Sequence, residues 1–217
     1  MLQGGLVDIL INITCALFGA ILGSYAGYKY TVKLSNDKTE NQRNALFNEI
    51  SIINDDFVDW FKALTDEYNT PLRKSYSGPP LIYTQLIENL IVELSGTNRL
   101  LSLDQRRFLI GLKNKNEALL KKDKERDVHS NRWLLESNKL TKLNKLKIKQ
   151  SIEFWTAHLL QESIDLAFYT AKYLDCKENF IFGEYSMNDK IIELCRYADI
   201  NYNQDFWNGV IRRCSAA

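Results

Sequence analysis

His158 and Glu162 have the spacing in this sequence that best suits catalysis. Residues four apart share one face of a helix, where they could act as an acid/base pair or as two metal ligands. The same spacing arises often by chance, and we favour a histidine hydrogen-bonded at the edge of a helical bundle. No HExxH, GxGxxG, GxxxxGK[ST] or GxSxG motif is present. The sequence therefore predicts no catalytic residue and a protein that is not an enzyme.

Metal and cofactor sites are not predicted either. The chain has four cysteines without a CxxC pair and only two histidines, so no local spacing of zinc ligands is present. A zinc site formed by Cys176, Cys195, Cys214 and His158 would need the fold to bring them together. The favoured interpretation makes these three cysteines reduced, small and buried.

Three glycines four residues apart, Gly19, Gly23 and Gly27, form a GxxxGxxxG pattern. On a helix they share one sector with Asp8 and Asn12. Glycines at this spacing let a second helix approach closely inside a membrane. The sequence thus predicts a homo-oligomer, with packing on another membrane protein as the alternative. Asp8 and Asn12 would line the outer mouth if the oligomer formed a pore.

A basic patch is formed by Lys139, Lys142, Lys145 and Lys149. Residues 113–149 contain twelve cations and five acids, a net charge of +7, whereas the whole chain carries 28 Lys and Arg against 27 Asp and Glu. The patch could be a solvated face, or it could bind the anionic membrane leaflet, a protein partner or nucleic acid. Lysines without arginine or interleaved aromatic residues suit point-charge attraction better than base recognition, so nucleic acid is the least favoured partner.

A possible ligand pocket is predicted from the aromatic residues near the C-terminus. Twelve of the 25 aromatic side chains lie within residues 154–207. Aromatic side chains fill cores more often than they line pockets. If a pocket exists, we expect it where the loop 180–186 meets a long helix, with Trp155, Tyr185 and Arg196 around it.

The elements that position these residues begin with an apolar run. Residues 9–28 contain no charged side chain, and twenty helical residues span about 30 Å, the thickness of a bilayer's hydrocarbon core. We expect one transmembrane helix rather than a cleaved signal peptide, because no Lys or Arg precedes it. Lys29, Lys33, Lys38 and Arg43 follow it. The positive-inside rule then places residues 1–8 outside and residues 29–217 in the cytoplasm, on a single-pass protein of the inner (plasma) membrane.

The remaining sequence predicts an all-α fold. A polar stalk or linker covers residues 29–45, and the helical domain covers 46–217. Its helices number about five to six: a periodic apolar helix over 46–68, one ending at Gly96, one opened by a capping box at Ser102, a turn near 128–131, a long helix over 132–174, and two short helices capped by Ser186 and Asp205. Alternating patterns with hairpin turns are missing, so a sheet is not expected.

This general plan resembles that of small bacterial membrane-anchored proteins, including some effectors of phage defence and abortive infection. The resemblance lies in the architecture alone and covers no motif. It leaves two functions open. The first is a membrane-anchored helical protein that self-associates through its glycine face and binds a protein partner with its cytoplasmic bundle. The alternative is a membrane-perturbing or pore-forming effector, triggered through the cytoplasmic domain.

Overall fold

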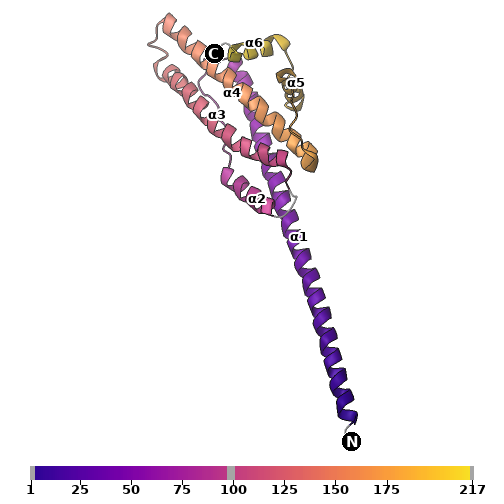
Figure 1. Ribbon diagram of the computed structural model, residues 1–217. Helices are drawn as coiled ribbons and strands as arrows, with labels where there is room; N and C mark the ends of the chain where they lie inside the picture. Colours follow the sequence, from indigo (N-terminus) through magenta and orange to yellow (C-terminus); the bar gives the residue numbers. More distant parts are fainter. Residues whose placement is uncertain (1–2, 97–100, 216–217) are drawn as a thin grey trace. The chain divides into compact units, whose positions relative to one another are not determined.

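The chain folds into α-helices joined by loops and turns (Figure 1). The computed structural model describes the backbone of residues 3–96 and 101–215, and the side chains of residues 13–94 except 84 and of residues 101–215. Within these ranges there is no strand, so the predicted all-α fold is confirmed. The elements are α1 (Gln3–Asn69), α2 (Thr84–Gly96), α3 (Leu103–Glu136), α4 (Lys142–Cys176), the short 3-10 helix η1 (Lys177–Asn179), α5 (Met187–Tyr197) and α6 (Gln204–Ser215).

The chain divides into two units, residues 1–45 and 46–217. The first consists of the N-terminal part of α1. No helix in the described part of the chain has a stretch that is both long and apolar enough to cross a membrane. The predicted transmembrane helix is therefore without support from the structure. Its first four residues, 9–12, have side chains outside the described ones.

The second unit is a helical bundle around the C-terminal part of α1. The predicted apolar stripe is confirmed, because Leu46, Ile50, Phe57, Phe61 and Leu64 are fully buried. Around it, α4 packs against α3, α5 and α6, and α2 packs against α3. Burying this one stripe on several helices supplies the hydrophobic stabilisation of the bundle. The helix ends at Asn69, before Pro71, as the proline predicts.

The boundary between the two longest helices of the bundle differs from the prediction. We expected a turn near 128–131, but α3 continues to Glu136, and the turn covers residues 137–141. The Thr141 side chain accepts a hydrogen bond from the backbone N–H of Asn144 and so caps the start of α4. We expected the helix to end after the charged residues 121–127. Instead, side chains of this run form salt bridges within α3, as between Arg126 and Asp123, and with α4, as between Lys122 and Glu162.

Local capping signals predicted two of the other helix starts correctly. Ser102 and Gln105 form the reciprocal capping box of α3, and Ser186 caps α5. The prediction of Asp205 as a cap is wrong. Asn203 accepts from the backbone N–H of Phe206 at 3.1 Å, which leaves Asp205 in the first turn of α6. Either residue type can cap a helix, so the sequence alone did not separate them.

Candidate functional site

The three glycines of the predicted association face lie on α1, so their helical spacing is real. A methyl group added at Gly19, Gly23 or Gly27 would have no atom of the described residues within 4 Å. No packing inside the described chain therefore requires glycine at these positions. The side chains of Asp8 and Asn12, predicted on the same sector, lie outside the described ones.

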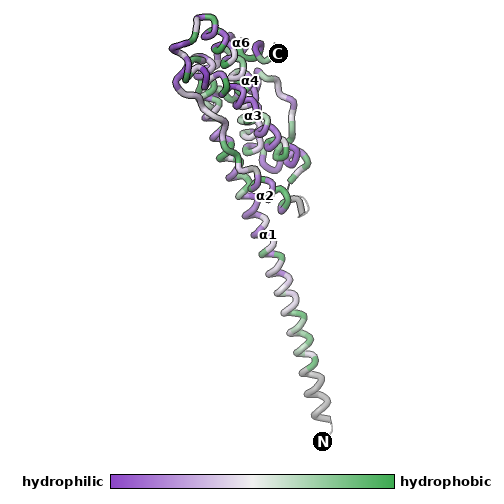
Figure 2. Tube along the Cα trace, turned by 90° about the vertical axis from the view of Figure 1, so that its left-hand side faces the viewer, coloured by the Kyte–Doolittle hydropathy of each residue, from purple (hydrophilic) through white to green (hydrophobic). Residues whose placement is uncertain are grey.

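The rest of this helix surface is apolar and exposed. Side chains with more than half of their surface exposed are Ile13, Leu17, Phe18, Ile21, Leu22, Tyr25, Tyr28 and Tyr30. In Figure 2, the coloured N-terminal part of α1 is mainly white and green before purple becomes frequent. Soluble proteins rarely leave a large continuous apolar surface in contact with water.

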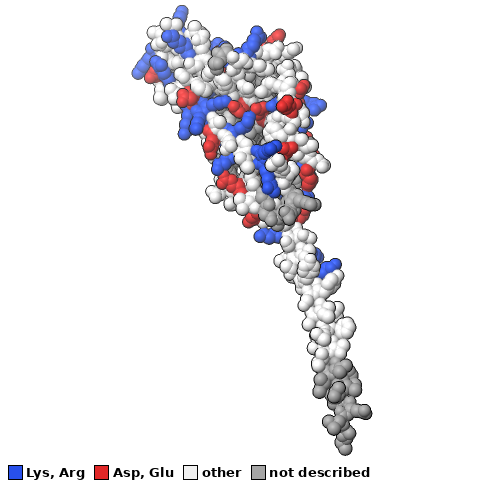
Figure 3. Space-filling view, in the orientation of Figure 1, with Lys and Arg blue, Asp and Glu red and all other residues white. Residues whose placement is uncertain are grey.

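The four lysines of the basic patch lie at the connection between α3 and α4, and the three on α4 share one face of that helix. Lys139 is in the turn, and Lys142, Lys145 and Lys149 are on α4. The Lys145 ammonium lies 5.9 Å from the centre of the Trp133 ring, and Lys149 is 3.6 Å from Glu153. Figure 3 shows Lys and Arg side chains gathered at this end of the bundle. We call residues 132–150 the hairpin tip.

The hairpin tip also exposes apolar side chains that the sequence analysis overlooked. Leu134, Leu135, Leu143 and Leu146 are all exposed, Leu135 to 84%. Lys139, Lys142 and Lys147 lie among these leucines, are exposed and form no salt bridge with the described residues, so the hairpin tip offers apolar area together with positive charge.

The predicted ligand-pocket residues are not brought together. Trp155 lines a shallow pocket on α4 with Phe154 and Lys147. Tyr185 packs against Phe168, with the ring centres 4.9 Å apart. Phe168 is also on α4, thirteen residues after Trp155. At 1.5 Å per residue, thirteen residues correspond to about 20 Å. Arg196 is exposed on α5.

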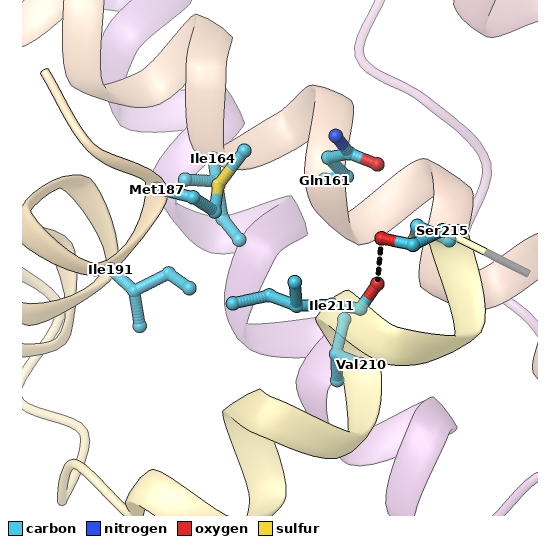
Figure 4. A pocket seen from close by; sticks show the side chains of 8 residues that line it. Gln161, Ile164, Met187, Ile191, Val210, Ile211 and Ser215 are labelled. Carbon is cyan, nitrogen blue, oxygen red and sulfur yellow. Dashed lines mark hydrogen bonds between the residues drawn. The ribbon is translucent and has the colours of Figure 1, made fainter.

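A different pocket lies between α4, α5 and α6, with a volume of about 120 Å³ (Figure 4). Five of the eight residues that line it are apolar: Ile164, Met187, Ile191, Val210 and Ile211. The other three are Gln161, Cys214 and Ser215. The Ser215 hydroxyl donates to the Ile211 carbonyl at 3.0 Å, which satisfies it within the helix. An apolar cavity of roughly 150 Å³ can hold benzene, so this pocket would fit one small apolar group.

Glu162 does not act as a partner of His158. The Glu162 carboxylate accepts hydrogen bonds from Lys122 at 2.6 Å and Lys115 at 3.3 Å, and Lys115 also reaches Asp165 at 2.8 Å. The His158 ring packs on Phe154, with the ring centres 4.5 Å apart. Burial, and then the charge of Lys122, lowers the pKa of His158, whereas Glu162 acts in the opposite direction. Glu162 is thus part of an ion-pair cluster between α3 and α4, and His158 lies close enough to feel the charge of Lys122.

This cluster joins a third helix and makes stability depend on pH. Lys190 of α5 donates to Asp165 at 2.8 Å. Burial alone would raise the pKa of both carboxyl groups, but hydrogen bonds from the lysines and their charges outweigh it, so the pKa values of Glu162 and Asp165 are lowered. A lowered pKa in the folded state stabilises the protein above the unfolded pKa, and that stabilisation is lost as the pH falls through the lowered value.

We therefore expect the stability of the double variant Glu162→Gln/Asp165→Asn to change less with pH in the acid range than that of the unmodified protein. The free energy of unfolding of the unmodified protein should fall between pH 7 and pH 3.5, and the variant should lose about 1–2 kcal/mol less over the same range. Urea unfolding followed by circular dichroism measures it. The matched control is Glu125→Gln/Glu184→Gln, at two exposed carboxylates. An equal change in the control would mean that the lysine cluster is not the cause.

A buried ion-pair network was missed by the sequence analysis. The Arg126 guanidinium, fully buried, lies 2.5 Å from Glu67 and 2.7 Å from Asp123, and it also donates to the backbone carbonyl of Ser77 at 2.7 Å. The Ser77 backbone N–H donates to the other oxygen of Glu67 at 2.6 Å. Burial raises the pKa of Asp123, although the Arg126 charge opposes this. No sequence signal reveals it, because Glu67 is 59 residues from Arg126.

The same network fixes the loop between α1 and α2, residues 70–83. Two indole N–H groups donate to backbone carbonyls of this loop, Trp60 to Ser77 and Trp133 to Arg73, each at 3.1 Å. The Tyr76 hydroxyl donates to the Pro71 carbonyl at 2.7 Å, and its ring lies 5.8 Å from the Arg126 guanidinium. These contacts hold the loop against α1 and α3.

The cysteines are in different environments. Cys195 is buried, Cys214 is half-buried and Cys176 is exposed, so the expectation of three buried thiols is wrong for Cys176, which lies in the last turn of α4. Burial raises the pKa of the Cys214 thiol to about 11, which makes it a poor nucleophile. Among the side chains that the structure describes, no group of three His, Cys, Asp or Glu residues could hold a metal ion.

Comparison with known proteins finds no match among family models, curated proteins or solved structures.

Proposed function

We propose that this protein is a non-enzymatic membrane anchor and assembly protein, in which the N-terminal part of α1 inserts into the bilayer and self-associates through Gly19, Gly23 and Gly27. The observation that carries the proposal is the exposed apolar surface of residues 13–28, on which glycines recur every fourth residue. If residues 9–28 span the membrane, the Lys and Arg residues that follow them are expected to stay in the cytoplasm. The proposed location of the bundle is therefore the cytoplasm.

The exposed apolar side chains support the anchor. Residues 9–28 contain no charged side chain and continue directly into the helix that forms the centre of the bundle. Leaving this many large apolar groups in water costs roughly 25 cal/mol per Å² of apolar area, so an apolar phase stabilises them strongly. A cell fractionation tests this: we expect the protein to remain in the membrane pellet after a high-salt wash. Recovery of the full chain in the supernatant would contradict the anchor.

The glycines support the self-association, because nothing inside the described chain explains them. Glycine destabilises a helix interior by about 1 kcal/mol relative to alanine. Three such residues on one face, with open space beside each of them, lower the stability of the isolated helix with no gain in its own packing. A second helix that packs closely on this face would supply the gain, through dispersion contacts between backbones.

We expect the triple variant Gly19→Leu/Gly23→Leu/Gly27→Leu to dissociate the oligomer. Side chains at these positions would hold a second helix apart, while the fold of one chain has room for them. The association in mild detergent should weaken by at least about tenfold, or roughly 1.4 kcal/mol. Analytical ultracentrifugation of the full chain over a range of protein-to-detergent ratios measures it.

The matched control is Leu17→Ala/Ile21→Ala/Tyr25→Ala, which changes three residues with the same spacing on the opposite side of the helix. We expect this variant to keep the oligomer of the unmodified chain. A monomer for the unmodified chain at every ratio would overturn the self-association. If the glycine variant still formed the oligomer and the control variant did not, the association would be assigned to the opposite face of the helix.

The bundle is proposed to bind a protein partner at the membrane, and the hairpin tip is the surface that best supports this role. Four of its leucines are exposed, and its exposed lysines, Lys139, Lys142 and Lys147, form no salt bridge with the described residues. The effector alternative depends on Asp8 and Asn12, whose side chains lie outside the described ones, so it stays a prediction from the sequence.

A further inference from the structure

We propose that the partner of the hairpin tip is a second copy of this chain, docked through an acidic surface of α1. The acidic surface consists of the exposed side chains of Asp55, Asp56, Asp59 and Asp66, with the exposed Ile52 beside them. The tip of one copy would pack on this surface of the next. This inference deepens the proposed assembly function by adding a second contact, in the bundle, that is independent of the glycine face.

The tip carries a strong local charge that is not neutralised. Residues 132–150 contain six cations and one acid, a net charge of +5. Among the described residues, Arg132 pairs with Glu136 and Lys149 pairs with Glu153. The remaining lysines in the turn and on α4 form no salt bridge with the described residues: Lys139, Lys142, Lys145 and Lys147. Four exposed leucines lie among them, so a partner must offer negative charge together with some apolar area.

The acidic surface of α1 offers both. Asp55, Asp56 and Asp66 form no salt bridge with the described residues, and Asp59 pairs weakly with Lys62 at 3.3 Å on an exposed face. The first and last of the four carboxylates are eleven residues apart in the sequence, or about 17 Å along the helix. Ile52, 58% exposed, gives the leucines an apolar contact. The bundle therefore displays two complementary surfaces on different helices, a combination that suppresses wrong partners and fixes the docking register.

The positions of both surfaces in the bundle suit copies that stand in parallel. Trp133 of the tip donates to Arg73, four residues after the end of α1. The tip therefore lies at the same end of the bundle as the C-terminal end of α1, where Asp66 is located. Two copies side by side in the same orientation could bring the tip of one to the level of the acidic surface of the other. Such a contact joins unlike surfaces, so it can continue from copy to copy.

The contact need not be strong to matter. A contact formed largely by exposed lysine and aspartate side chains gives weak, salt-sensitive binding in solution. Copies held together in a membrane have effective concentrations in the millimolar range. Under these conditions a contact with a millimolar dissociation constant would be about half occupied, and it would extend the assembly beyond the oligomer formed by the glycine face.

The test is a charge exchange on the full chain reconstituted in vesicles of uncharged lipid, where the copies share one membrane. The tip variant is Lys142→Glu/Lys147→Glu, and the surface variant is Asp55→Lys/Asp56→Lys; all four residues are exposed. Energy transfer between separately labelled copies reports their association. We expect each variant mixed with itself to associate at least about tenfold more weakly at low salt. Mixing the two variants, or combining all four substitutions in one chain, should restore the association.

Two controls make the result specific. Lys121→Glu/Lys124→Glu changes the net charge by the same amount at exposed lysines of α3 outside the tip, and it should leave the association unchanged. The same measurements in the Gly19→Leu/Gly23→Leu/Gly27→Leu background separate the two contacts. The glycine contact should not respond to salt, whereas the tip contact should weaken as salt rises.

Three results would overturn the inference. One is a charge-exchanged chain that associates as weakly as the single-surface variants. Another is an equal loss in the Lys121/Lys124 control. The third is tip variants that associate normally but lose binding to vesicles containing phosphatidylserine or to a single-stranded oligonucleotide, which would assign the tip to a membrane surface or to nucleic acid. Failure of the glycine variant to change the oligomer would affect only the proposed function.

Discussion

Replacing Arg126 by alanine should lower the free energy of unfolding by about 3–5 kcal/mol. The guanidinium is fully buried, and its removal leaves the Glu67 carboxylate, itself 2% exposed, without its cation. A buried charge without a partner costs several kcal/mol, which is more than the pair contributed when it was complete. The Ser77 carbonyl loses one donor as well. Such a loss is a large part of the total stability of a domain of this size.

Urea unfolding of the full chain in mild detergent, followed by circular dichroism, measures the effect. The control is Arg107→Ala, because Arg107 is 66% exposed and lies 3.6 Å from Asp104; we expect a change within about 0.5 kcal/mol. Should the alanine variant fail to fold, Arg126→Lys keeps the charge but not the two-pronged hydrogen bonding, and we expect an intermediate loss. Equal stability of the Arg126 and Arg107 variants would show that the network is not important for stability.

Trp207→Ala should cost a similar amount, about 3–5 kcal/mol, by a different mechanism. Trp207 is 1% exposed, stacks on Phe61 with ring centres 5.6 Å apart, and meets Phe206 edge-on at 4.8 Å. Its removal leaves a cavity between α1 and α6 that the neighbouring rings cannot fill. Because α6 is short and Trp207 is one of its two buried residues, with Val210, we expect the helix to detach first.

Hydrogen exchange of the α6 backbone, together with urea unfolding, checks this prediction. Protection in α6 should fall more than protection in α3. Trp155→Ala is the matched control, since Trp155 is half-buried at a shallow pocket on α4, and it should cost clearly less. A uniform loss of protection across all helices would contradict the local detachment of α6 and indicate that the whole bundle opens as one unit.

The sequence predicted those parts of the fold that depend on neighbouring residues. The capping box at Ser102, the cap at Ser186 and the end of α1 before Pro71 follow from contacts within four residues, and all three are confirmed. The turn between α3 and α4 was misplaced, because the charged residues before it are stabilised by distant partners such as Glu162. A charged run looks the same in the sequence whether it faces water or another helix.

The candidate sites were predicted less well for the same reason. The glycine spacing needs only a helix, and the helix is present. The predicted pocket of Trp155, Tyr185 and Arg196 required three elements to converge, which no local pattern encodes. Arg126 is one of the twelve cations within residues 113–149, and no pattern in the sequence distinguishes it from the others, although it is among the most buried side chains. The apolar surface of the hairpin tip was missed because its leucines fit a helical core pattern equally well.

The network around Arg126 also bears on how long the protein survives in a cell. Residues 70–83 form a connection without helix, and Arg73 and Lys74 within it are cleavage sites for trypsin-like proteases. A protease must pull such a segment into an extended strand before it can cut. Here the segment is held by Arg126, Trp60 and Trp133, so cleavage has to wait for these contacts to break. Cleavage within residues 70–83 therefore depends on the opening of these contacts.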